Sequence, residues 1–297
     1  MRFNPSSGPR QKVLSLALAL LTLLAPAAAY ARPMPQNPQN EPRPPFPSAK
    51  YIPSHDYDTR HVKLDLRFDW EREQAVGTET FTFAPLVKDL RRVDLDAAFM
   101  SFASVRLASG APLKFDFDEK SERLRITLDR AYQPSEEVAL VISYNTVSPA
   151  TEKRSVNGGG GLNFIKPTPD DPRRPRQIWS QGETEYNHYW FACFDHPNDF
   201  FTSELVATVE KPLSVISNGR LVETKENADG TRTFHWRIAA PHASYLSSII
   251  VGEYVAVTGE YAGIPVITNV YPNEVEEGKI TAARLPEMVK FFSEMTG

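Results

Sequence analysis

Residues 62–69 read Val-Lys-Leu-Asp-Leu-Arg-Phe-Asp, and this stretch decides the fold of the chain. Apolar and charged side chains alternate along it without exception. Because successive side chains of a strand point to opposite faces, a period of two predicts a strand with one buried and one solvated face. The same period recurs over residues 78–83, 124–128, 138–144, 205–209 and 234–238. So many short strands predict a mainly β fold, either an antiparallel sandwich or an open barrel.

The turn signals between these stretches agree with that prediction. Asp229-Gly230 lies between two alternating stretches, as the turn of a tight β-hairpin does. Toward the C-terminus, residues 264–270 predict one more strand. Apolar residues then recur at helical spacing at Ile280, Ala283, Leu285, Met288, Val289 and Phe292. Pro286 is expected either to start this helix or to kink it.

The first 53 residues predict processing and spacing rather than a folded core. Arg2, Arg10 and Lys12 precede an apolar run over 13–24, and Ala29-Tyr30-Ala31 ends it, which predicts a secretory signal peptide over 1–31. A membrane anchor is disfavoured, because a bilayer core requires about 20 apolar residues. We therefore expect a secreted or periplasmic protein with no membrane span after cleavage. Residues 32–53 contain eight prolines and predict an extended linker.

Composition excludes several classes of function. The chain has 33 Lys and Arg against 37 Asp and Glu, a net charge of −4, so it lacks the basic surface that nucleic acids require. Cys193 is the single cysteine, which excludes an internal disulfide framework and any Cys-x-x-Cys site. The six histidines include no pair four residues apart, so the sequence contains no His-Glu-x-x-His zinc motif.

Residues 179–197 contain the densest cluster of acids, amides and aromatic side chains. Aromatic rings favour burial, whereas carboxylates resist it unless they are paired. One interpretation is a structural knot in which Asp195 caps a turn at His196-Pro197 and Cys193 is buried. The other is that Gln181 and Glu183 face a cleft and accept hydrogen bonds from the cation of a ligand. The sequence pattern leaves both interpretations open.

This cluster also carries a family resemblance. Two stretches resemble the signature of zinc aminopeptidases related to aminopeptidase N and the leukotriene hydrolases. The first is Ser180-Gln181-Gly182-Glu183, which resembles the family's Thr-Gln-x-Glu. After nine intervening residues comes Cys193-Phe194-Asp195-His196-Pro197, which resembles Pro-Cys-Phe-Asp-Glu-Pro. Further matches keep the family's order. They are 161–164 (Gly-Leu-Tyr in the family), 215–219 (Ala-Leu-Ser-Asn-Gly), 244–246 (Ser-x-Tyr-Leu) and 263–266 (Gly-x-Pro-Val).

The resemblance implies a domain organisation. Residues 54–260 are expected to form a saddle-like antiparallel β-sandwich, the N-terminal domain of such enzymes. Residues 261–297 are expected to supply the first strand and helix of an α/β thermolysin-like catalytic domain that is truncated here; a C-terminal helix docked on the sheet is the alternative. In the complete enzyme, His-Glu-x-x-His and a later Glu hold zinc. We therefore expect this chain to bind no metal, to carry no catalytic residue and to be inactive alone.

The resemblance also implies a function, namely the N-terminal part of a secreted zinc metalloaminopeptidase that removes N-terminal residues from peptides. Glu183 aligns with the family's glutamate that binds the free α-amino group, and Gln181 with an amide that lines the same pocket. The implied partners are a peptide with a free N-terminus and the missing catalytic domain. One alternative is a stand-alone noncatalytic β-domain that binds peptide termini or a partner protein. Another is a carbohydrate-binding sandwich that uses Trp179, Trp190, Tyr186 and Tyr189.

Overall fold

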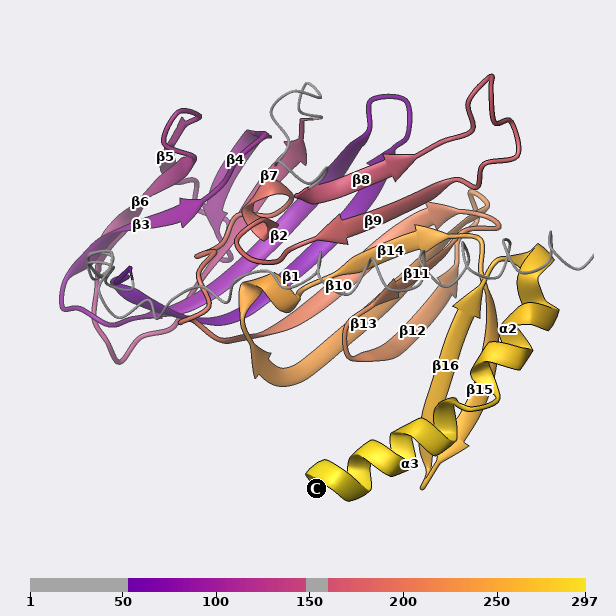
Figure 1. Cartoon of the computed structure of the whole chain (residues 1–297). Helices are drawn as coiled ribbons and strands as arrows, with labels where there is room; N and C mark the ends of the chain where they lie inside the picture. Colours follow the sequence, from indigo (N-terminus) through magenta and orange to yellow (C-terminus); the bar gives the residue numbers. More distant parts are fainter. Residues whose placement is uncertain (1–52, 148–159) are drawn as a thin grey trace, which may run out of the picture. The chain divides into compact units, whose positions relative to one another are not determined.

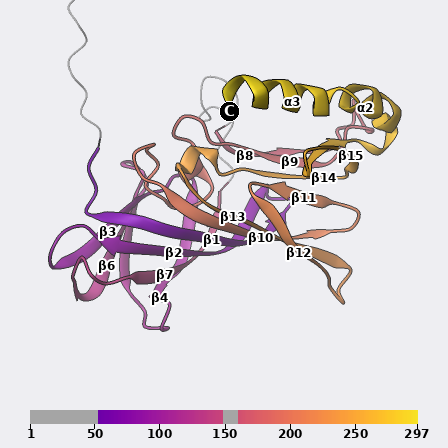
Figure 2. The ribbon, with the colours of Figure 1, turned by 90° about the horizontal axis from the view of Figure 1, so that it is seen from below.

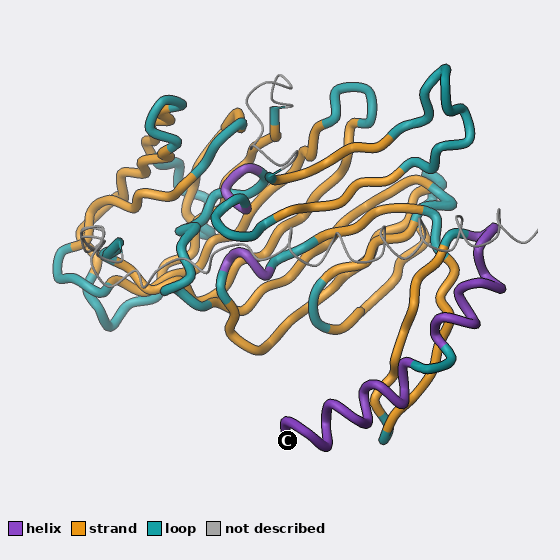
Figure 3. The backbone as a smooth tube through the Cα atoms, viewed as in Figure 1, coloured by secondary structure: helices purple, strands orange, loops and turns teal. Residues whose placement is uncertain are grey.

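Strands dominate the residues that the computed structural model describes, which are 53–147 and 160–297 (Figures 1 and 3). The predicted signal peptide over 1–31 and nearly all of the predicted linker over 32–53 lie outside the described residues. All described residues belong to one compact unit, Ile52–Gly297.

The largest sheet has seven strands in the order β12-β13-β10-β1-β2-β7-β4. Their bounds are β1 Tyr57–Asp69, β2 Gln74–Pro85, β4 Met100–Leu107, β7 Val138–Thr146, β10 Phe201–Glu210, β12 Arg220–Glu226 and β13 Thr231–His242. The alternating stretch lies in β1, where Val62, Leu64 and Leu66 are buried. The predicted hairpin joins β12 to β13. All neighbours in this sheet are antiparallel except β1 and β10, which pair in parallel.

Two smaller sheets complete the β-sandwich. One has the order β11-β14-β9-β8, with β8 Gly161–Ile165, β9 Gln177–Gln181, β11 Ser214–Ser217 and β14 Ile249–Gly252; the other has the order β3-β6-β5, with β3 Leu90–Asp96, β5 Lys114–Asp118 and β6 Arg123–Tyr132. Figure 2 shows β8, β9 and β14 as a layer over β1, β10 and β13. One apolar core unites all three sheets through side chains such as Leu66, Ile126 and Ile178. Burial of each such side chain contributes about 1.5–3 kcal/mol.

The C-terminal part contains the hairpin β15 (Val255–Tyr261) and β16 (Ile264–Val270), followed by α2 (Val275–Ala282) and α3 (Leu285–Thr296). The strand predicted over 264–270 is therefore confirmed. The predicted single helix is two helices, and Pro286 lies in the first turn of α3, where its missing N–H has no helical partner to lose. α2 packs closely on the hairpin, because a Cβ on Gly278 would lie only 2.7 Å from Val270.

This C-terminal part leaves many apolar side chains exposed. Ile264 and Ile267 on β16 are each more than half exposed. The following residues of α2 and α3 are too, and we call them the apolar C-terminal face: Ile280, Met288, Phe291, Phe292 and Met295. Short 3₁₀ helices lie at η2 (Asn187–Tyr189), at η3 (Ser244–Leu246) and, directly before α2, at η4 (Pro272–Glu274). Within residues 53–147 and 160–297, none of the helices has the length and apolar character that crossing a bilayer requires.

One side chain breaks the apolar pattern of the core. Glu79 lies on the same face of β2 as Phe81 and Phe83 and is 0% exposed. Its Oε2 accepts a hydrogen bond from the backbone N–H of Ala192 (3.0 Å), and its Oε1 has no partner among the described residues. Burial raises the pKa of Glu79 well above its usual range, and the hydrogen bond from Ala192 opposes this only in part. Burial thus favours the protonated form of this carboxyl over the charged form.

Glu79 should make folding pH-dependent. Its folded-state pKa is raised, so its contribution to stability is complete below the unfolded pKa of about 4.5 and is lost as the pH rises toward the folded pKa. We expect Glu79→Gln to remove a slope of up to about 1.4 kcal/mol per pH unit from the unfolding free energy over this range. Urea unfolding at several pH values between 5 and 8 measures it. Glu210→Gln, at an exposed site, is the control, and parallel profiles for Glu79→Gln and the unmodified chain would contradict the assignment.

Candidate functional site

Segments that are distant in sequence meet at one end of the four-stranded sheet. β9 ends at Gln181, which pairs with Gly161 at the start of β8. On the other side of β9, the N–H of Ile249 donates to Ser180 Oγ (2.9 Å). η3 lies just before β14 in the chain and contacts the loop that follows β9. The stretches 161–164, 180–183 and 244–246, which the sequence singles out separately, are thus brought to one place.

The two residues singled out for ligand binding lie at this place. Gln181 is half-buried, and its Nε2 donates to the backbone carbonyl of Glu183 (3.1 Å). Glu183 is exposed, and its carboxylate has no hydrogen-bond or ion-pair partner within residues 53–147 and 160–297. A cavity of about 970 Å³ lies elsewhere, lined by residues that include His55, Arg91 and Arg125, and neither Gln181 nor Glu183 lines it. Glu183 is therefore an unpaired acid on the surface.

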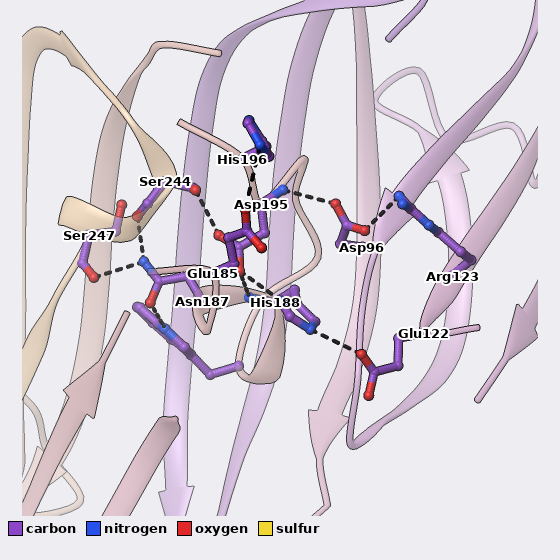
Figure 4. Close-up of polar contacts among 11 residues, drawn as sticks. Asp96, Glu122, Arg123, Glu185, Asn187, His188, Asp195, His196, Ser244 and Ser247 are labelled. Carbon is purple, nitrogen blue, oxygen red and sulfur yellow. Dashed lines mark hydrogen bonds and ion pairs between the residues drawn. The ribbon is translucent and has the colours of Figure 1, made fainter. Parts of the chain in front are cut away.

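The loop after Gln181 is fixed by the buried amide of Asn187 (Figure 4). Its Nδ2 donates to the backbone carbonyls of Ser244 and Ser247, and its Oδ1 accepts from Trp190 Nε1 (2.7 Å). Gly182 packs against this amide, since a Cβ there would lie 2.6 Å from Asn187 Oδ1. A side chain at position 182 would therefore displace the amide.

A second buried group, the carboxylate of Asp195, ties the same loop to its surroundings (Figure 4). Oδ2 accepts from the backbone N–H of His188 (3.0 Å) and lies 2.7 Å from His188 Nδ1, while Oδ1 accepts from Ser244 Oγ (2.7 Å). The Asp195 N–H donates to Asp96 Oδ2 (3.0 Å), and Asp96 pairs with Arg123. Asp195 is thus structural, but it connects three segments rather than capping a turn at His196-Pro197.

His188 is the basic side chain inside this network. Burial alone would lower its pKa, but its hydrogen bond to Asp195 and the charges of Asp195, Asp96 and Glu122 outweigh burial and raise the pKa above the usual value. Its Nε2 lies 3.4 Å from Glu122 Oε2. The acids in the interior of the site are therefore compensated internally, in contrast to the carboxylate of Glu183.

The site does not offer a set of metal ligands. The described parts of the chain contain no group of three His, Cys, Asp or Glu side chains placed to hold a metal ion. His188 and Asp195 are committed to each other, and burial raises the pKa of the Cys193 thiol well above its usual range, which opposes the thiolate that metals bind. These residues do not fit a zinc ion.

Several residues that shape the site were not singled out from the sequence. The sequence places Asn187 in the cluster over 179–197 and Ser244 in the stretch 244–246 that matches the family. Neither signal indicates the contact between these two segments, because it joins positions about 60 residues apart.

The sequence is similar to that of several known proteins. A family model described as the peptidase M1 N-terminal domain matches residues 55–246. Among curated proteins, the transcription initiation factor TFIID subunit 2 of Gallus gallus is 30% identical over 139 residues, which are 46% of this chain and 12% of that protein. Leucine aminopeptidase 2 of Vanderwaltozyma polyspora is 24% identical over 220 residues, which are 70% of this chain and 32% of that protein.

Solved structures share the fold. The M1 zinc metallopeptidase of Deinococcus radiodurans superposes with a TM-score of 0.60 at 20% identity, covering 73% of this chain and 48% of the other. A two-domain M1 zinc metallopeptidase mutant bound to L-arginine gives a TM-score of 0.61 at 19% identity, with the same coverage. The chain thus spans about half of these structures, and about a third or less of the two curated relatives. Because the family model matches residues 55–246, more than half of the chain, the chain belongs to the peptidase M1 family and contains the N-terminal domain of that family.

Proposed function

We propose that this chain is the part of a secreted zinc aminopeptidase that recognises the amino terminus of a peptide. Glu183 binds the α-ammonium group, and Gln181 lines the same pocket. The observation that carries the proposal is an unpaired, exposed carboxylate on a loop that buried polar side chains hold in place. A carboxylate in this position selects free amino termini, because an acylated terminus lacks the charge and leaves the acid unpaired.

The strength of this recognition depends on the removal of water. An ion pair at an exposed site contributes only about 0–1 kcal/mol. The same pair about 4 Å apart gains about 4 kcal/mol at an effective dielectric constant near 20, before desolvation is subtracted. Glu183 on this chain alone therefore binds an ammonium group weakly, and a covering domain makes the binding strong.

The apolar C-terminal face supports such a covering domain. Exposure of apolar side chains such as Ile280 (77% exposed) and Phe292 (61% exposed) to water is unfavourable, and exposed apolar surface of this kind commonly marks an interface. We propose that this face packs against the remainder of an α/β catalytic domain, which also holds the zinc ion and the catalytic residues. The location outside the cytoplasm rests on the signal pattern over 1–31.

A noncatalytic β-domain is the second candidate. It is favoured by one comparison, because the relative from Gallus gallus carries the name of a transcription factor subunit rather than a peptidase. In that case the sandwich would bind a partner protein or a peptide terminus without any associated hydrolysis. Binding selectivity and the state of association separate the two candidates.

The role of Glu183 is testable by NMR titration of the isotopically labelled chain. Leucyl-glycine should shift the backbone resonances of Glu183 and its neighbour Gln181, and N-acetyl-leucyl-glycine should not. Glu183→Gln removes the negative charge and should abolish the shifts. Glu185→Gln, at an exposed acid two residues further on, is the matched control and should retain them. Equal shifts by both peptides, or shifts that persist in Glu183→Gln, would remove the assigned role.

The covering surface is testable by the state of association. If the apolar C-terminal face normally lies against another domain, the product comprising residues 32–297 should self-associate. Phe291→Ser together with Ile280→Ser should shift light scattering toward the monomer. Phe200→Ser is the control, since Phe200 is as exposed as Phe291 (55% and 56%) but lies before β10. A clean monomer without any substitution would favour the stand-alone β-domain.

A further inference from the structure

We propose that Asn187 is a positioning residue for Glu183: its buried amide fixes the backbone at Gly182 and thereby sets where the Glu183 carboxylate stands. The proposal rests on the assignment of Glu183 as the acid that binds the substrate ammonium. Asn187 itself touches no substrate, because its side chain is fully buried behind the loop.

The hydrogen bonds of Asn187 leave its amide with a single orientation. A side-chain amide has two N–H donors and one carbonyl acceptor. Both donors are used on the carbonyls of Ser244 and Ser247, and the acceptor is used on Trp190 Nε1. Flipping the amide would place its oxygen against two carbonyl oxygens, so the observed orientation is the only one that satisfies all three partners.

The amide acts on the Glu183 loop through Gly182. A Cβ on Gly182 would lie 2.6 Å from Asn187 Oδ1 and also 2.6 Å from the backbone carbonyl oxygen of Tyr245, so both atoms leave no room for a side chain. On the other side, the N–H of Tyr186 donates to the Gly182 carbonyl (2.9 Å) and closes the turn that contains Glu183. Gly182 is thus held between the amide, η3 and the turn, and the next residue along the chain is Glu183.

A second asparagine shows that this role differs from simply holding η3. Asn218 fixes the same stretch, since its Nδ2 donates to the carbonyl of Leu246 (2.8 Å) and its Oδ1 accepts from the N–H of Ser248 (2.6 Å). Asn218 is not among the atoms nearest to a Cβ on Gly182, whereas Asn187 is. The two amides therefore share the η3 stretch, and of the two it is Asn187 that also packs against Gly182.

Removal of the Asn187 amide has a defined physical consequence. Asn187→Ala leaves two buried carbonyls and the indole N–H of Trp190 without their partner and opens space beside Gly182. The turn that carries Glu183 then samples several positions. Because an ion pair depends on the separation of its charges, the affinity for an ammonium group falls even though Glu183 is still present.

The experiment compares Asn187→Ala with Asn218→Ala in the full chain. The first measurement is the NMR titration with leucyl-glycine, and the second is amide hydrogen exchange at Tyr186, whose N–H reports the Gly182 turn directly. For Asn187→Ala we expect a loss of affinity of up to about fivefold and faster exchange at Tyr186. For Asn218→Ala, whose amide is only half-buried, we expect a smaller loss of global stability, with affinity and exchange at Tyr186 close to those of the unmodified chain.

Trp190→Phe provides a milder variant in case Asn187→Ala fails to fold. It removes one of the three hydrogen bonds that orient the amide and should give an intermediate change in both measurements. Equal effects of Asn187→Ala and Asn218→Ala would overturn the proposal, because they would reflect only the loss of η3. If the unmodified chain does not respond to leucyl-glycine, the proposed function fails, while exchange at Tyr186 still decides whether Asn187 fixes the loop.

Discussion

The site depends on the requirement that the buried carboxylate of Asp195 be compensated. An ionised carboxylate away from water is strongly destabilising unless charge and hydrogen bonds surround it. Asp195 meets this requirement with His188 from its own loop and Ser244 from η3, while its N–H binds Asp96 on β3. Three segments that are distant in the chain are thereby held together, and Glu183 is left outside the network as an unpaired acid.

The sequence predicted those parts of the fold that depend on neighbouring residues. Alternation over 62–69 predicted β1, and Asp229-Gly230 predicted the hairpin of β12 and β13. The parallel pairing of β1 with β10 could not be predicted, because it joins strands more than 130 residues apart and leaves no local pattern. The burial of Glu79 has the same origin. Its place in the alternation over 78–83 is that of a core residue, but the hydrogen bond that its carboxyl accepts in the core from the Ala192 N–H joins positions 113 residues apart.

The candidate site also has a part that the sequence predicted and a part that it could not predict. Gln181 and Glu183 could be singled out because they lie in a contiguous motif together with residues whose order is shared with the family. The geometry that gives them meaning comes from Asn187 and Ser244, which bind partners about 60 and 50 residues away. Contacts of this kind join segments that the pairing of β9 with β14 brings together, and a period of two describes a single strand only.

The division between compensated and uncompensated acids also bears on the proposed function, because it predicts weak binding by this lobe alone. Interior acids such as Asp195 have their partners within the lobe, so their contribution is to stability and is independent of any ligand. Glu183 has water as its partner, and the free energy of an ammonium–carboxylate pair there remains small until that water is displaced. Under the proposed function, recognition of a peptide amino terminus is therefore shared between this lobe, which fixes the acid, and the surface proposed to close over it. Selectivity for the free amine would then arise only in the covered state, because only there does an unpaired carboxylate carry its full penalty.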